Sequence, residues 1–357
     1  MMRAQLTKVA LVGAAASLLM GSLAGCSAAD EGSGEAGGKI AFLMPDRAST
    51  RYEEQDSPLF KKKVAELCEN CEVLYQNADG DAAKQQQQVE SMVAQGVDVI
   101  VIDAVDTTAA ASSVQSAQAS DIKVVTYDRP VPSVPADFYV SFDNKEIGAL
   151  IAQSLIDHLA DEGITEGGLL MVNGSPSDDA AMLIKEGSVE VVEDSGFDVL
   201  ASYDTPDWVP QKAQDWVSGQ ISQFRDDVVG VVAANDGTAG GTIAAFKAAG
   251  VSDLPPVTGN DAEVAAIQRV ISGDQYNTIS KPISIVAEKA AEVAVGYING
   301  DTPEADTELF DTPSALFVPE VVTSENVKEK IFDAEIYTTD DVCTSEYADA
   351  CAELGIE

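Results

Sequence analysis

The sequence predicts an α/β fold of two doubly wound, parallel-sheet lobes joined by a three-strand hinge. Short, nearly continuous apolar runs recur along the chain and are typical of strands buried on both faces of a parallel sheet. Segments with an apolar stripe at helical spacing lie between these runs, so strands and helices alternate. Ten candidate strands in such an alternation are too many for one ordinary open sheet, and we therefore expect two lobes.

The first 38 residues precede the predicted fold. Arg3 and Lys8 give a positive start, and an apolar run then ends in the small residues before Cys26. This order is typical of an export signal. Over residues 1–25 it resembles a bacterial lipoprotein signal, in which the thiol of the next residue, Cys26, is acylated. An ordinary signal peptide with an incidental cysteine is the alternative. Residues 26–38, rich in Gly, Ala and Ser, predict a flexible tether.

From residue 39 onward the predicted strands and helices alternate. The apolar stripe of Val89, Met92 and Val93 is an example of the helical spacing. Strands are predicted over Lys39–Met44, Glu72–Gln76, Asp98–Asp103, Lys123–Tyr127, Phe138–Ser141, Gly168–Val172, Val199–Tyr203, Val228–Ala233, Pro256–Gly259 and Tyr276–Ser280. Helices are predicted over Ala82–Gln95, Lys145–Ala160, Asp178–Ser195, Pro210–Phe224, Gly237–Ala249, Glu263–Gly273 and Ile283–Asn299.

The charge of the chain limits its partners. Sixty acidic and 21 basic residues give a net charge of −39, spread along the sequence without a long acidic block. Such a surface repels nucleic acid and anionic lipid headgroups and favours a monomer.

The cysteines fit an exported protein. Four remain beside Cys26, and we expect two local disulfides, although four cysteines allow three connectivities. The expected pairs are Cys68 with Cys71 and Cys343 with Cys351. A redox or metal motif at Cys68 and Cys71 is the alternative, but no second C-x-x-C and no nearby His accompany it. We expect neither a metal nor a cofactor.

Polar side chains recur where the predicted strands end. One such residue alone would indicate a helix N-cap or a surface turn. Because the carboxyl ends of parallel strands meet at one edge of a sheet, a series of them predicts a shared polar pocket between the lobes. The series comprises Asp46, Arg51 and Tyr52, Asp103, Asp128 and Arg129, Asn235, Asp261, and Lys281.

These residue types suit a ligand rich in hydroxyl groups, such as a sugar. Planar Asp, Asn and Arg groups make charge-assisted hydrogen bonds to hydroxyls, and aromatic rings cover the apolar face of a sugar ring. Tyr52 and Trp208 lie in polar loops and are candidates for that stacking, whereas Trp216 lies within a helix and is expected to pack in the core.

Groups for catalysis are sparse, and we do not expect an enzyme. His158, the only histidine, lies near the C-terminal end of a helix, and the chain contains neither a G-x-S-x-G nor a Walker motif. A glycosidase stays open as an alternative, because paired carboxylates occur readily among 60 acidic residues.

At these motifs the sequence resembles periplasmic binding proteins of the ribose/galactose/xylose type, above all the D-xylose-binding proteins and next the multiple-sugar-binding proteins of plant-associated bacteria. The resemblance extends from Lys39 to Ser324. The segments that carry it are Gln86–Ile102, Thr126–Arg129, Tyr139–Asn144, Asn173–Asp179, Ala234–Gly241, Thr258–Glu263 and Ser280–Ile283.

The resemblance implies roles for individual residues. Arg51 and Tyr52 match an Arg-aromatic pair of the first loop, and Asp128 and Arg129 match a pair that bridges adjacent hydroxyls. Further expected ligands of the sugar are Asp179, Trp208, Asn235, Asp261 and Lys281. At Asp178-Asp179-Ala180 this chain departs from the Asp-Asn-Asn of the xylose-type pattern, which leaves other aldoses (glucose, galactose or multiple sugars) open.

The resemblance also implies the domain boundaries and the partners. We expect one lobe from residues 39–142 and 282–311, a second from 143–281 and 312–331, and a C-terminal tail over 332–357. A bound monosaccharide would close the lobes, and an ABC permease would receive it. The protein would be exported and held at the outer face of the cell membrane by Cys26. A sugar-sensing receptor is the alternative partner.

Overall fold

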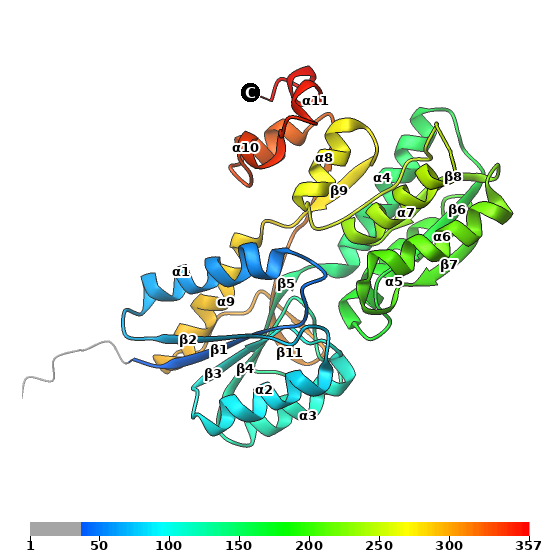
Figure 1. Cartoon of the computed structure of the whole chain (residues 1–357). Helices are drawn as coiled ribbons and strands as arrows, with labels where there is room; N and C mark the ends of the chain where they lie inside the picture. Colours follow the sequence, from blue (N-terminus) through cyan, green and yellow to red (C-terminus); the bar gives the residue numbers. More distant parts are fainter. Residues whose placement is uncertain (1–36, 357) are drawn as a thin grey trace, which may run out of the picture. The chain divides into compact units, whose positions relative to one another are not determined.

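The computed structural model describes residues 37–356, so the predicted signal and lipidation site at Cys26 lie outside the described residues. The first lobe is built on a seven-stranded sheet in the order β10-β11-β5-β4-β3-β1-β2 (Figure 1). All neighbours in it are parallel except β10 and β11. Its strands are β1 (Lys39–Met44), β2 (Glu72–Asn77), β3 (Val99–Ile102), β4 (Lys123–Tyr127), β5 (Phe138–Phe142), β10 (Thr307–Leu309) and β11 (Thr312–Phe317).

Helices cover both faces of this sheet, as the apolar runs predict. In β1, Phe42 belongs to the apolar cluster under α1 and α9, while Leu43 belongs to the cluster under α2 and α3. Successive side chains point to opposite faces, so a strand buried on both faces must be apolar throughout. The helices are α1 (Ser57–Leu67), α2 (Ala82–Ala94), α3 (Thr107–Gln118) and α9 (Ile283–Ile298).

The second lobe contains two smaller sheets. One has β6 between β7 and β8, all parallel, and the other pairs β9 with β12 in antiparallel fashion. The predicted strand at Pro256–Gly259 is reduced to a single bridge at Val257, because prolines 255 and 256 supply no backbone N–H. The strands are β6 (Gly168–Asn173), β7 (Asp198–Asp204), β8 (Val228–Ala233), β9 (Asn277–Ser280) and β12 (Glu320–Thr323).

The helices of the second lobe pack closely. A Cβ atom added at Gly148 would lie 1.9 Å from the carbonyl oxygen of Ile184, so this glycine permits α4 to approach α5 directly. The helices are α4 (Asn144–Asp161), α5 (Asp179–Glu193), α6 (Pro210–Phe224), α7 (Asp236–Ala248) and α8 (Val264–Ser272).

The chain passes between the lobes at three places. These are the junction of β5 and α4, the junction of β9 and α9, and residues 318–319 between β11 and β12. The sequence placed the last boundary at residue 311, which is wrong by several residues. Thr312–Phe317 pairs with β5 in the first lobe, a long-range contact that local pattern does not reveal.

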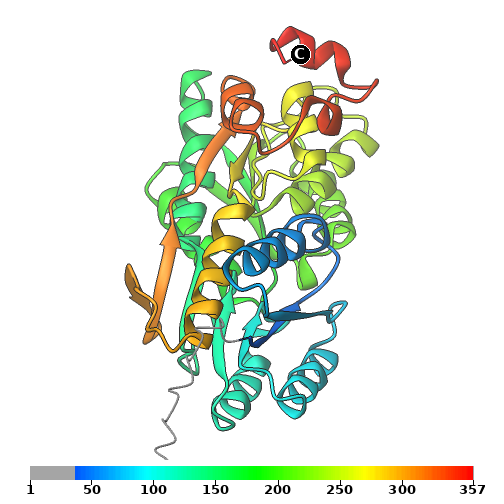
Figure 2. The ribbon, with the colours of Figure 1, turned by 90° about the vertical axis from the view of Figure 1, so that its left-hand side faces the viewer.

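A C-terminal tail follows β12 and lies against α8 (Figure 2). It contains η3 (Lys328–Asp333), α10 (Thr339–Val342) and α11 (Ala348–Glu353). The structure joins Cys343 to Cys351 here and Cys68 to Cys71 at the end of α1, the local pairing expected from the sequence.

Candidate ligand-binding site

A polar cavity lies between the two lobes. Eight of the nine predicted sugar ligands line it, Asp179 being the exception. From the first lobe come Asp46, Ser49, Arg51, Tyr52, Asp128 and Arg129. Asn144, Asp178, Ala180, Ile184, Trp208, Asn235, Asn260, Asp261 and Lys281 complete the lining.

Arg51 is held rigidly at the start of a short π-helical segment, η1 (Tyr52–Asp56), that precedes α1. Its guanidinium donates to both carboxylate oxygens of Asp56, at 3.1 and 2.9 Å, and to Oδ2 of Asp128 at 3.2 Å. Asp56 also accepts a hydrogen bond from the hydroxyl of Tyr127 at 2.5 Å. This fork-to-carboxylate geometry fixes the orientation of Arg51 before any ligand arrives.

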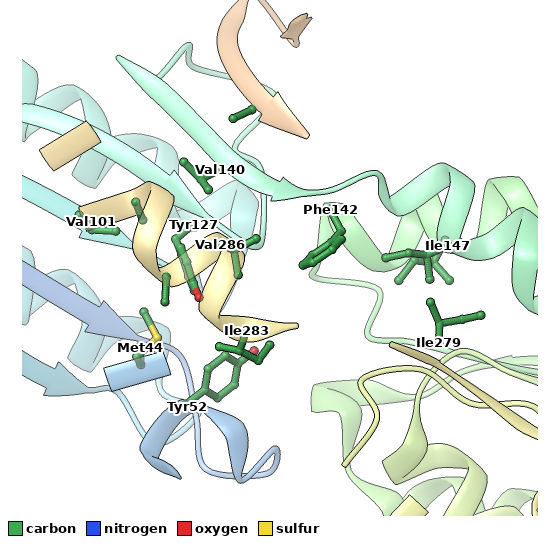
Figure 3. Packing of buried hydrophobic residues seen from close by; sticks show 14 of the residues in the cluster. Met44, Tyr52, Val101, Tyr127, Val140, Phe142, Ile147, Ile279, Ile283 and Val286 are labelled. Atoms are coloured by element: carbon green, nitrogen blue, oxygen red, sulfur yellow. The ribbon is translucent and has the colours of Figure 1, made fainter. Parts of the chain in front are cut away.

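This segment also packs against the hydrophobic core of the first lobe. Tyr52, Met44, Tyr127 and Ile283 belong to one apolar cluster, shown in close view (Figure 3). Tyr52 is buried and its ring lies 5.2 Å from the guanidinium carbon of Arg51. The predicted ligand pair therefore combines a charged group with a ring whose position is set by the core.

Arg129 connects the lobes. Its Nη1 donates to the carbonyl of Ala104 at 2.8 Å and its Nη2 to the hydroxyl of Tyr52 at 3.2 Å. Its Nε lies 3.0 Å from Oδ2 of Asp178 in the second lobe and 3.3 Å from Asp103. Asp103, which the sequence placed at the site, lies behind Arg129 and does not line the cavity. Burial raises the pKa of Asp103 well above its usual range, against the opposing effect of Arg129.

Asp128, Lys281 and Asp261 form a second charged group. Lys281 Nζ lies 2.9 Å from Asp261 and 3.9 Å from Asp128. Burial raises the pKa of Asp128, but Arg51 and Lys281 lower it more, so the net pKa lies below its usual value. Asn235 donates to Asp261 at 3.4 Å and caps α7. These groups present carboxylate acceptors and fixed donors to the cavity.

Trp208 lies on the second lobe with the six-membered ring of its indole against Gly174. A Cβ atom at Gly174 would come within 2.1 Å of the ring, so the ring occupies space that any side chain at this position would fill. The indole Nε1–H donates to Asp178 at 2.9 Å. Asp207 and Trp208 both have positive φ angles, of 58° and 56°, which turn the chain sharply after β7.

Asp178 lines the cavity, whereas Asp179, which the sequence predicted as a ligand, does not. Asp178 is the N-cap of α5 and accepts from the backbone N–H of Ala180 at 2.8 Å, so its side chain lies over the helix start. Asp179 lies in the first turn, where its carboxylate accepts from the hydroxyl of Thr107 in the first lobe at 2.5 Å. Burial raises the pKa of Asp178, while Arg129 and Trp208 act in the opposite direction.

Several lining residues were missed from the sequence. The polar ones lie within two residues of a predicted residue or of a strand end, which is the signal that could have found them. The apolar ones lie on α5 and carry no such signal. They are Ser49, Asn144, Asp178, Ala180, Ile184 and Asn260.

The family of the chain is shown by a sequence profile for the periplasmic binding protein domain, which matches residues 40–302. The chain belongs to the periplasmic binding protein family. Its two-lobed fold with parallel sheets is that of the type I members, as predicted, and this family consists of solute-binding proteins.

Individual relatives extend this result to most of the chain. A D-xylose-binding periplasmic protein of Escherichia coli is 35% identical over 301 residues, 82% of this chain and 89% of the relative. A multiple sugar-binding periplasmic receptor of Rhizobium radiobacter is 31% identical over 330 residues, 85% of this chain and 92% of the relative.

Solved structures agree with the fold. An ABC transporter solute-binding protein from Clostridium phytofermentans, with bound β-D-glucose, superimposes with a TM-score of 0.77 at 25% identity, covering 85% of this periplasmic binding protein and 99% of that chain. A carbohydrate transporter solute-binding protein from Chloroflexus aurantiacus, in complex with D-glucose, gives a TM-score of 0.77 at 26% identity over 85% and 97% of the two chains. Within residues 37–356, no helix has the length and apolar character needed to cross a membrane.

Proposed function

We propose that this periplasmic binding protein captures a monosaccharide, D-xylose in the first instance, by closing its two lobes and delivers it to an ABC importer. The observation that carries the proposal is the convergence of three cations, four carboxylates and two aromatic rings from both lobes on one cavity. The cations are Arg51, Arg129 and Lys281, the carboxylates Asp46, Asp128, Asp178 and Asp261, and the rings Tyr52 and Trp208.

The chemistry of this lining suits neighbouring hydroxyl groups on a ring. Each hydroxyl both donates and accepts a hydrogen bond, so it is best satisfied between a carboxylate and a cation. Asp128 beside Arg51, and Asp261 beside Lys281, offer such donor and acceptor pairs. The Trp208 ring would cover an apolar face of the sugar, where its π surface meets the C–H groups.

Closure follows from the way the lining is divided between the lobes. Arg51 lies 4.0 Å from Asp261 and Arg129 lies 3.0 Å from Asp178, both across the boundary between lobes. A sugar held by both lobes binds the closed form more tightly than the open form, and it thereby shifts the population toward closure. The surrounding protein also excludes water and strengthens the hydrogen bonds to the ligand.

Delivery and location rest on the family and on the N-terminal sequence. Relatives described as ABC transporter solute-binding proteins support a permease as the recipient of the closed form. We propose that the acylated Cys26 and the tether hold the protein at the outer face of the membrane, which raises its concentration near that permease. We further propose that it acts as a monomer.

The identity of the sugar is tested by isothermal titration calorimetry of the purified protein with D-xylose, D-glucose, D-galactose, D-ribose and L-arabinose. We expect saturable binding, strongest for D-xylose. Stronger binding of glucose or of several sugars would favour the second candidate, a broader aldose-binding protein, which the multiple-sugar and glucose-bound relatives support. Binding of none of these sugars would contradict the proposal.

Asp128→Asn locates the binding in this cavity. Loss of a charge-assisted hydrogen bond costs about 1.5–3 kcal/mol, so we expect roughly 10- to 150-fold weaker binding. Asp121→Asn is the matched control, because Asp121 is exposed and has nearly the same φ angle, 61° against 60°. Equal affinity in the two variants would show that the sugar binds elsewhere.

A further inference from the structure

The C-terminal tail belongs to the second lobe by its packing. Val342, Cys351 and Ile356 form one apolar cluster with Ile267 and Ile271 of α8. Gln268 of α8 donates a hydrogen bond to the carbonyl of Val342 at 2.9 Å. The disulfide between Cys343 and Cys351 closes the tail on itself. The tail must therefore move with α8 when the lobes move.

One side chain of the tail reaches the first lobe. The hydroxyl of Tyr337 accepts a hydrogen bond of 2.7 Å from Nε2 of Gln55, and this contact is partly buried. Ile336 lies beside Tyr337, facing Gln55 and Leu59 across a groove between the lobes. Burial raises the pKa of Tyr337 to about 12, so its hydroxyl stays neutral at ordinary pH values.

The partner of Tyr337 lies in the segment that carries two of the first-lobe ligands, Arg51 and Tyr52. Gln55 is part of η1, together with Tyr52 and Asp56. Asp56 holds Arg51 through two hydrogen bonds. Tyr337 therefore contacts η1 from outside the cavity, whereas Tyr52 of the same segment lines the cavity. π-Helical turns of this kind are frequent at functional sites.

We propose that Tyr337 and Gln55 form a latch, which stabilises the closed arrangement of the lobes and so sets how slowly the bound sugar leaves. The hydrogen bond joins a residue fixed on the second lobe to one fixed on the first, so separation of the lobes must break it. Where the open form predominates without ligand, an interaction present only in the closed form increases the ratio of closed to open protein and tightens ligand binding by the same factor. The inference rests on the proposed function for its effect on a sugar.

The latch predicts a kinetic signature. A neutral hydrogen bond typically changes an equilibrium by about two- to tenfold, so we expect Tyr337→Phe to release the sugar about two to ten times faster. The association rate should stay unchanged, because the sugar enters the open form, in which the latch is already broken. The measurement is stopped-flow fluorescence of the purified protein, with Trp208 as the reporter.

Matched variants separate the latch from a general effect of tail mutations. Tyr347→Phe removes a hydroxyl from the same tail at a position that packs within the α8 cluster, and we expect wild-type release. Gln55→Met removes the other partner of the latch. The double variant Gln55→Met with Tyr337→Phe should be no faster than either single variant, since both remove one interaction. Additive effects, or wild-type release from Tyr337→Phe, would overturn the latch.

A second measurement needs no sugar and distinguishes failure of the latch from failure of the proposed function. Spin labels carried by unnatural amino acids at the exposed positions of Asp121 in the first lobe and Arg225 in the second report the separation of the lobes. In the unliganded protein, we expect Tyr337→Phe to increase the ratio of open to closed populations about two- to tenfold. An unchanged distance distribution would refute the latch whatever the ligand is.

Discussion

The indole Nε1–H of Trp208 and the guanidinium Nε of Arg129 meet the same oxygen, Oδ2 of Asp178, at 2.9 and 3.0 Å. Trp208 and Asp178 lie in the second lobe, whereas Arg129 lies in the first. Asp178 thus orients the ring of the proposed stacking residue and pairs with a cation across the cleft.

Trp208→Ala should weaken binding of the sugar about 10- to 100-fold without unfolding the protein. The ring is only partly buried, so its loss removes contact with the ligand more than it disturbs the core. Calorimetry measures the affinity and a thermal melt measures the stability. Trp216→Phe is the control, because Trp216 stacks on Tyr203 at 5.2 Å and does not line the cavity. Unchanged affinity in Trp208→Ala would show that the pocket is misplaced.

Gly174→Ala should reduce affinity more than tenfold, because the added methyl group would lie 2.1 Å from the Trp208 ring and push it toward the cavity. A Cβ atom at Gly219, within α6, has no heavy atom within 4 Å. Gly219→Ala should therefore leave binding unchanged and stabilise the protein by about 0.5–1 kcal/mol. Titration of both variants with D-xylose measures the difference. Equal affinities would mean that the Trp208 ring can shift to accommodate the methyl group without loss of binding.

Asp178→Ala and Asp179→Ala should differ strongly although the residues are adjacent. Loss of Asp178 leaves Arg129 without its cross-lobe partner and releases the indole, so we expect at least a 30-fold loss of affinity. Loss of Asp179 removes a hydrogen bond from Thr107 that also joins the lobes but lies outside the cavity, and we expect a change of about two- to tenfold. The reverse order, measured by calorimetry, would restore Asp179 as the ligand.

Stability should fall as the pH rises from 5.5 to 8.5. Burial raises the pKa of Asp236 to about 7 and that of Glu263 to about 8. Both stay protonated in the folded protein at pH values at which they are ionised in the unfolded chain. The unfolded state therefore binds fewer protons, and the free energy of unfolding decreases as the pH rises. One such group contributes a slope of about 1.4 kcal/mol per pH unit until the pH passes its folded pKa.

The melting temperature across this pH range measures the effect. Asp236→Asn should flatten the dependence, because the amide does not titrate. Asp226→Asn is the control, since Asp226 is exposed, and it should keep the wild-type slope. A melting temperature that rises with pH in the wild-type protein would contradict the expected sign.

Most of the site could be predicted because parallel strands carry its residues to one edge. Asp128 follows β4 and Asn235 follows β8, so position after a strand was enough to find them. Arg51 lies at the start of η1 and Trp208 in a turn after β7, so neither directly follows a strand, and the resemblance to a family identified both. Trp208 stands out as an aromatic residue in a polar turn, and the structure places it on the cavity wall.

The sequence by itself determined the alternation of strands and helices, the two-lobed α/β class and the lining residues that directly follow strands, because period and strand ends are local properties. Only the tertiary structure decided between Asp178 and Asp179, since helix capping turns one side chain toward the cavity and the other toward Thr107. Long-range pairing likewise assigned β11 to the first lobe, and packing on α8 brought Tyr337 to Gln55. These outcomes depend on contacts between segments distant in sequence, which no local pattern encodes.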